Sequence, residues 1–211
     1  MKRILLFVAL ALALVGCSAG ESQQKQVTTT ANDVITQTQA ASTALKTINE
    51  TTTSVPSEFQ RESEKSNTPL TADSKTIKPL LTKRDQAYQR LIDIQSQLNQ
   101  DAGSLSKAKN QANGQLPQTE LTTLLSSLKL IQLDHKTLLS YYDEVTTAET
   151  SLFDSEKSGD DSKTINSDLV ALNQYASTLG QQIDISLANL DAAAANAKQL
   201  TKAINNSSSN Q

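Results

Sequence analysis

This chain of 211 residues has few of the residues that usually hold a globular protein together. It contains one cysteine, no tryptophan, three phenylalanines and four tyrosines. A single cysteine excludes an intramolecular disulfide, so stability must come from packing alone. The shortage of large aromatic side chains argues against a deep core. It favours helices that lie side by side around a narrow seam of leucine, isoleucine and alanine.

Basic residues and histidine are also scarce. The chain carries 19 lysines and arginines against 22 acidic residues, a net charge of −3. Nucleic-acid binding depends on basic patches, so this balance argues against a nucleic-acid partner. A di-iron bundle needs Glu-x-x-His on two helices and a zinc site needs further ligands, whereas His135 is the only histidine and follows Gln132 by three residues. We interpret His135 as a half-buried seam residue.

Other constellations that carry chemistry are missing. The sequence contains no Gly-x-Ser-x-Gly turn and no glycine-rich phosphate loop. Asp160 and Asp161 lack the spaced ligands of a calcium loop and are better explained as a helix cap. We predict no enzyme activity and no catalytic, cofactor-binding or metal-binding residue. Tyr141 and Tyr142, with Phe153 further on, are the best candidates for a sugar contact, although heptad spacing favours Tyr142 in the core.

The start of the chain is its most informative stretch. Residues 1–3 are Met-Lys-Arg, and residues 4–15 form an apolar run. This run of about 12 residues is too short to span a membrane, which needs roughly 20. Residues 14–17 read Leu-Val-Gly-Cys. A charged start, an apolar run and a small residue at the cut site are typical of an export signal, so we predict a signal peptide at 1–16 and cleavage between Gly16 and Cys17.

The tetrapeptide at 14–17 resembles the bacterial lipobox. The resemblance implies that Cys17 becomes the new N-terminus and carries an S-diacylglyceryl group of palmitate type, with N-acylation as a further option. Two acyl chains hold a protein firmly on a bilayer, whereas one holds it only marginally. The expected location is therefore the extracellular face of the cell membrane, with lipid as the anchor. The alternative is a secreted protein with a chance cysteine at the cut site.

The mature chain has a clear helical period. After a small, polar stretch at 17–26, which we expect to be a flexible tether, apolar residues recur at alternating steps of four and three through 27–204. The pattern predicts helices at about 24–52, 76–112, 117–154 and 161–204. Residues 54–74 are expected to connect the first two helices, either as a solvated loop or with a short helix starting at Pro56. Residues 205–211 are expected to be a disordered tail.

The seam of the last three helices is apolar at 28 of 33 positions. Among the exceptions, we interpret Arg84 and Asp101 as register devices or half-exposed ends. Four further leucines widen the stripe of the third helix, namely Leu125, Leu130, Leu133 and Leu139. Short links at 113–117 and 155–161 require antiparallel neighbours. The predicted fold class is all-α, an elongated antiparallel helical bundle or coiled coil of three to four long helices in a domain at 27–204.

The lipobox, the polar tether and the long helices together resemble the YkyA-like family of cell-wall-binding lipoproteins of Gram-positive bacteria. Ala-Tyr-Gln-Arg-Leu at 87–91, Leu-Ser-Tyr-Tyr at 139–142 and Leu-Phe at 152–153 fit the style of that family. The resemblance covers roughly residues 17–204. It implies a non-catalytic envelope protein, and Cys17 is the only residue whose role carries over.

Two functional hypotheses follow. In the first, a lipid-anchored bundle contacts the cell wall, with peptidoglycan or another wall polymer as its partner. In the second, the bundle is a helical adaptor or spacer that docks another envelope protein. An enzyme or a solute receptor is disfavoured, because the sequence lacks a nucleophile–base pair and a two-lobed α/β pattern. Apolar residues left uncovered on a helix face would favour the second hypothesis.

Overall fold

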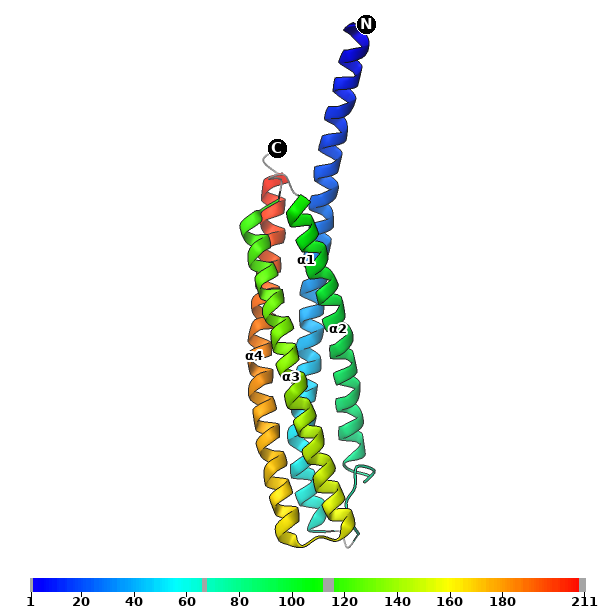
Figure 1. The fold of residues 1–211 in the computed structure, drawn as a ribbon, viewed down its shortest axis with the longest axis vertical. Coiled ribbons are helices and arrows are strands. Elements are labelled where there is room, and N and C mark those ends of the chain that lie inside the picture. Colours follow the sequence, from blue (N-terminus) through cyan, green and yellow to red (C-terminus); the bar gives the residue numbers. More distant parts are fainter. Residues whose placement is uncertain (1, 66–67, 112–115, 209–211) are drawn as a thin grey trace. The chain divides into compact units, whose positions relative to one another are not determined.

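The computed structural model describes residues 2–65, 68–111 and 116–208, with side chains described between 21 and 207 of these ranges. Four helices make up the fold, α1 (Lys2–Ser63), α2 (Lys78–Gln111), α3 (Gln118–Ser158) and α4 (Ser162–Ser208). Throughout these described ranges there is no strand. The predicted all-α bundle of long helices is confirmed (Figure 1).

The chain forms two compact units. Unit 1 comprises Met1–Thr38, Gln97–Lys129 and Ala192–Gln211, and unit 2 comprises Gln39–Ser96 and Leu130–Asp191. Each helix contributes one segment to each unit. Within a unit, segments that follow one another along the chain run in opposite directions (Figure 1). Each unit is therefore a short antiparallel four-helix bundle.

The core of unit 1 is the predicted heptad seam. Its buried residues include small or medium-sized aliphatics from all four helices: Val27, Ala31, Val34, Leu98, Leu105, Ala108, Leu121, Leu124, Leu128, Ala193, Ala197, Leu200 and Ile204. Alanine recurs at the seam of α4, where it allows close approach of neighbouring helices. Apolar burial at the expected period of 3.5 residues confirms the heptad.

The core of unit 2 continues the same period with larger side chains. Its buried members include Leu45, Ile48, Val55, Phe59, Leu91, Ile94, Leu138, Tyr142, Val145, Leu152, Phe153, Leu172, Leu179 and Ile183. Phe59 and Phe153 pack with ring centroids 6.1 Å apart. Aromatic and charged side chains are both buried in this core.

The α3–α4 hairpin begins its second helix at a well-formed cap. The Thr164 backbone N–H donates to Asp161 Oδ1 at 2.8 Å, and this bond lowers the pKa of Asp161. Asp161 is thus the N-cap that the sequence predicted. Gly159 adopts a φ of 71°, a left-handed conformation that favours glycine after a helix end. The turn between the two helices is therefore short and specified locally.

Side chains along this hairpin keep one register. In unit 2, Ser155 Oγ donates to Asp168 Oδ2 at 2.6 Å and Asn189 Nδ2 donates to Asp134 Oδ2 at 2.7 Å. In unit 1, Asn196 Nδ2 donates to Ser127 Oγ at 2.8 Å. In each pair the two residues are equally far from the turn along the chain. Polar pairs at the edge of the seam therefore support the register that the apolar residues set.

Helix α1 begins earlier than the predicted 24 and includes residues 17–26, which we expected to be a flexible tether. Residues 21–26 are Glu-Ser-Gln-Gln-Lys-Gln, and all but the serine are good helix formers. Gln23 Nε2 also donates to the backbone oxygen of Ala108 on α2 at 3.1 Å. Local propensity and this contact explain the helical conformation.

Helix α1 also ends later than the predicted 52. It continues through Pro56 to Ser63, so the expected loop over this stretch is wrong. A proline inside a helix costs about 3 kcal/mol. Burying Val55 and Phe59, each at most 1% exposed, contributes roughly 1.5–3 kcal/mol apiece. Hydrophobic burial therefore outweighs the proline, a balance that helix propensity alone does not reveal.

Two smaller expectations also need correction. Helix α4 continues to Ser208, so residues 205–208 are not a disordered tail, while 209–211 lie outside the described residues. Leu130 and Leu133 were expected to widen the buried stripe of α3, but each is 50% exposed. Each lies two positions after a seam residue, which places it about 200° around the helix from the core. The first three residues of the predicted link at 113–117 lie outside the described residues.

Candidate functional site

The predicted lipidation site lies at the start of the chain. Residues 14–17 belong to α1, but the side chains of residues 1–20 lie outside the described set. Cleavage after Gly16 and lipid on Cys17 therefore stay predictions. In the described part of the chain, no helix has a segment that is both long and apolar enough to cross a bilayer.

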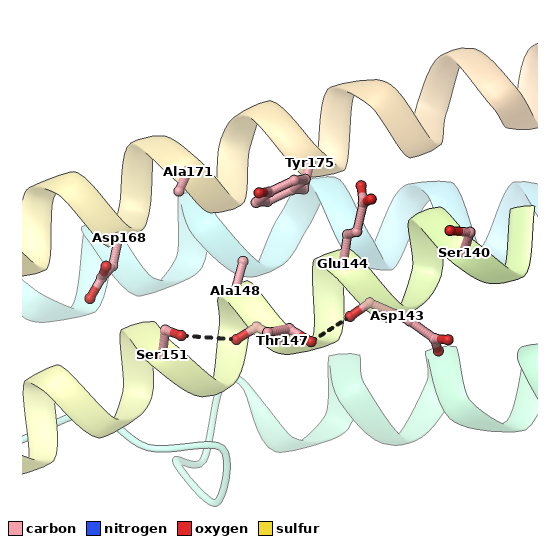
Figure 2. Close-up of a pocket in the computed structure, with 9 residues that line it drawn as sticks. All are labelled: Ser140, Asp143, Glu144, Thr147, Ala148, Ser151, Asp168, Ala171 and Tyr175. Carbon is pink, nitrogen blue, oxygen red and sulfur yellow. Dashed lines mark hydrogen bonds between the residues drawn. The ribbon is translucent and has the colours of Figure 1, made fainter.

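A groove in unit 2 combines polar and apolar side chains. It lies between α3 and α4 and has a volume of about 440 Å³. Figure 2 shows its nine lining residues: Ser140, Asp143, Glu144, Thr147, Ala148, Ser151, Asp168, Ala171 and Tyr175. The first six come from α3 and the last three from α4.

The groove exists because small residues face each other across the hairpin. Ala148 of α3 and Ala171 of α4 stand between the two helices, where larger side chains would fill the space (Figure 2). Tyr175 extends over this gap from α4 with 40% of its surface exposed, and the Glu144 carboxylate lies beside it. Tyr175 falls between the seam positions Leu172 and Ala176, which is why the core does not enclose it.

The lining of this groove carries charge of one sign. Three of its nine residues, Asp143, Glu144 and Asp168, are acidic, and none is lysine, arginine or histidine. The carboxylate of Asp143 points away from Tyr175 and Glu144 (Figure 2). Asp168 lies toward the other end of the groove and accepts a hydrogen bond from Ser155. Two carboxylates therefore flank the space above the alanines.

Two of the four hydroxyl groups that line the groove, those of Thr147 and Ser151, already use their hydrogens. Thr147 Oγ1 donates to the backbone oxygen of Asp143 at 2.8 Å, and Ser151 Oγ donates to that of Thr147 at 3.2 Å (Figure 2). The same bond to the carbonyl four residues back recurs along the helices, for example at Thr30, Thr43, Thr123 and Thr201. A hydroxyl in this arrangement keeps acceptor capacity but has no second hydrogen to donate. The groove is therefore rich in acceptors.

A charged pair lies in the seam of unit 2. Arg84 of α2 is 2% exposed, and its Nη1 and Nη2 donate to the two carboxylate oxygens of Glu149 of α3. Burial alone would lower the pKa of Arg84. The hydrogen bonds and the charge of Glu149 raise this pKa by more than burial lowers it, so the net pKa is raised. The guanidinium stays charged. Arg84 is therefore a buried, paired charge and not a half-exposed end, and its partner Glu149 was not identified from the sequence.

Aromatic rings extend this pair. The ring of Tyr142 stacks on Tyr88 at a centroid distance of 4.1 Å and an angle of 9°, and its hydroxyl donates to Asp85 Oδ1 at 3.0 Å. Arg84 Cζ lies 5.4 Å from the centre of the Tyr142 ring. Burial raises the pKa of Tyr142 well above its usual value. The stacked rings and the hydrogen bond join α2 to α3.

The aromatic residues that the sequence suggested for a sugar contact are mostly not exposed. Tyr142 is buried in the core, as heptad spacing indicated, Phe153 is also buried, and Tyr141 is half-buried. Tyr175, which sequence reasoning did not select, is the exposed aromatic in the groove. The available signal was its position off the seam.

The remaining singled-out residues behave as packing groups. His135 is half-buried, and this burial lowers its pKa, which favours the neutral imidazole. Asp101 of unit 1 is also half-buried. Burial raises its pKa, a hydrogen bond from Gln37 opposes the shift, and the charge of Asp33 adds to it. Across the described residues, no group of three or more His, Cys, Asp or Glu side chains could hold a metal ion.

Unit 1 has a groove with the opposite character. It has a volume of about 380 Å³ and lies between α1 and α4. Its lining residues are Asn32, Ile35, Lys198, Thr201, Lys202, Asn205 and Asn206. Two lysines and no carboxylate or aromatic ring line it. It lacks the flat apolar surface that the unit 2 groove offers to a ligand.

The chain has no recognisable match among characterised proteins. No protein-family model, no curated protein and no solved structure matches it. The arguments for function therefore depend on this chain's own residues.

Proposed function

We propose that this protein is a lipid-anchored, non-catalytic component of the cell envelope whose helical bundle binds a wall polymer. The observation that carries the proposal is Leu-Val-Gly-Cys at 14–17, placed directly after a charged start and a short apolar run. That order of features predicts export, cleavage before Cys17 and attachment to the outer face of the membrane.

Two features support a binding role. The groove of unit 2 combines an exposed tyrosine with acidic and hydroxyl side chains, a mixture of flat apolar surface and polar groups that suits ligand binding. Arg84 and Glu149, the buried ion pair of unit 2, are 2% and 4% exposed and do not line the groove. Peptidoglycan is the polymer expected beside an anchored protein of this kind, as the resemblance to cell-wall-binding lipoproteins also implies.

The adaptor or spacer remains as a second candidate, because apolar residues stay uncovered in unit 2. Leu130 and Leu133 of α3 are 50% exposed, and Ile185 of α4 is 53% exposed. Exposed apolar side chains on an outer helix face are candidates for contact with another protein, although single ones are common on any surface. The two candidates differ in what the bundle should capture.

The anchor is tested by substitution of its only possible attachment point. Cys17→Ser should move the protein from the membrane fraction to the soluble fraction and abolish labelling with radioactive palmitate, because the thiol is the lipid acceptor. Ser18→Ala is the matched control, which alters the neighbouring residue and should leave both readouts unchanged. If Cys17→Ser stays in the membrane fraction, and the wild-type protein carries no added lipid mass, the prediction of a lipid anchor on Cys17 is wrong.

The binding role is tested by sedimentation. The purified mature protein should co-sediment with isolated wall sacculi above the level of an unrelated coiled coil of similar length. A pull-down from detergent-solubilised envelope, with protein and glycan both analysed, is the parallel measurement. Recovery of a single envelope protein without glycan would replace wall binding with the adaptor. A protein that stays in the supernatant at every salt concentration would contradict wall binding.

A further inference from the structure

We propose that the α3–α4 groove of unit 2 binds an organic ammonium group, with Tyr175 as the apolar platform and Glu144 and Asp168 as the charge partners. The ligand class is an alkylammonium such as the side-chain amine of a wall peptide. The inference rests on the proposed function for the source of the amine, but its chemistry depends on the groove alone.

The lining of the groove carries negative charge. The groove is lined by three acidic residues and by no lysine, arginine or histidine, so its lining attracts cations and repels phosphate or carboxylate ligands. Glu144 and Asp168 lie on different helices and at different ends of the space above Ala148 and Ala171 (Figure 2). A cation between these two residues would have a carboxylate on each side.

The lining of the groove has more hydrogen-bond acceptors than donors. The hydroxyls of Thr147 and Ser151 donate to backbone oxygens, and Asp168 accepts from Ser155 while keeping further acceptor sites. A neutral sugar presents hydroxyls that accept as well as donate, so it needs donors from the protein, and the side chains of the lining offer at most two, the hydroxyls of Ser140 and Tyr175. An alkylammonium has three donors and no acceptor, which matches an acceptor-rich lining.

The groove also contains an exposed aromatic ring, that of Tyr175. Tyr175 is 40% exposed beside the Glu144 carboxylate, and the methyl groups of Ala148 and Ala171 lie near it (Figure 2). A cation near the face of an aromatic ring is attracted by the ring quadrupole. The alanines offer apolar surface to the alkyl part of the ligand. A bare metal ion would use neither feature.

Nuclear magnetic resonance on the full mature protein can test this inference directly. The sample is the lipid-anchored chain in an uncharged polyoxyethylene detergent at low salt, with ¹³C-labelled tyrosine and alanine. Because the chain has four tyrosines, the Tyr175 ring signals are readily assigned. Butylammonium is the probe, and 1-butanol, butyrate and glucose are the uncharged, anionic and polyol comparisons.

The expected result is a saturable shift of the Tyr175, Ala148 and Ala171 signals with butylammonium and no saturable shift with the other three probes. The affinity should fall as salt is added, because solvent-exposed charges are screened. Equal shifts with butanol would reduce the groove to a simple apolar surface. Binding of glucose or butyrate in place of butylammonium would also overturn the inference.

Variants identify the residues that act. Glu144→Gln should weaken butylammonium binding by about threefold, the effect of an exposed ion pair, and Glu144→Gln with Asp168→Asn should weaken it further. Tyr175→Phe should keep the affinity and Tyr175→Ala should lower it, because the ring is needed and its hydroxyl is not. Asp184→Asn is the matched control, an exposed acid on α4 outside the groove. Unchanged affinity in both the Glu144 variants would refute the assignment.

The same variants separate this inference from the proposed function. If wild type co-sediments with sacculi and the Glu144/Asp168 double variant does so equally well, wall binding stands and the groove is not its site. If butylammonium binds as expected and wild type does not co-sediment, the groove assignment stands and wall binding fails. Circular dichroism of each variant should show unchanged helicity, because Glu144 is exposed and Asp168 is only half-buried.

Discussion

The two units of this bundle use the same heptad but fill it differently. Unit 1 has no aromatic ring among its described side chains, and the apolar residues of its seam are leucine, isoleucine, valine and alanine. Unit 2 holds all four tyrosines, Phe59 and Phe153. It also holds the buried ion pair Arg84–Glu149. A shared period therefore sets where the seam runs, while its composition differs between the units.

This difference bears on specificity. An aliphatic seam tolerates a shift of one heptad, because one leucine or alanine replaces another with little loss. The pair of Arg84 and Glu149 does not, because a shifted register would bury each charge without its partner. Unit 2 thus contains the residues that define register between α2 and α3. The grooves differ in the same sense, with three acids in unit 2 and two lysines in unit 1.

The largest effect is expected from breaking the ion pair of unit 2. Glu149→Ala should lower the free energy of unfolding by about 3–5 kcal/mol, because Arg84 is left buried and uncompensated. Chemical denaturation followed by circular dichroism measures the loss. The double variant Arg84→Met with Glu149→Leu is the control and should recover most of the stability. A single variant as stable as wild type would show that the pair has no role in folding.

An aliphatic truncation tests the seam of unit 1. Leu105→Ala should cost about 2–5 kcal/mol, since Leu105 is fully buried and its removal leaves a cavity. Leu130→Ala is the matched control on an exposed leucine and should stay within about 0.5 kcal/mol of wild type. Urea unfolding of both variants provides the comparison. Similar losses for the two leucines would mean that the assigned burial is wrong.

The smallest effect concerns the half-buried acid of unit 1. Burial raises the pKa of Asp101, so its native state binds a proton more readily than its unfolded state does. Wild type therefore gains stability as pH falls through the raised pKa toward the usual one. Asp101→Asn lacks this titration and should be more stable than wild type at neutral pH.

The measurement for Asp101→Asn is the urea midpoint of both proteins across the acidic range, and the difference between them should shrink as pH falls. Asp191→Asn, an exposed acid on α4, is the control and should show no such trend. A stability difference that is constant with pH would mean that Asp101 titrates normally.

Several structural features were predictable from the sequence because they depend on short-range order. Steps of three and four between apolar residues predicted the helices and nearly all of the seam, and Asp161 was recognisable as a cap from its place before the fourth helix. The ends of α1 were not predictable in this way. Pro56 favours a break locally, and only the burial of Phe59 against Phe153 explains why the helix continues.

The sequence by itself determined the helical class, the heptad, the caps and the N-terminal pattern that predicts export, because each depends on residues close together in the chain. Only the tertiary structure decided that Arg84 pairs with Glu149 and that Tyr175, Glu144 and Asp168 line one groove. These residues are far apart along the chain or lie on different helices. Their meeting depends on the register between helices, which packing of the whole seam sets and no local pattern encodes.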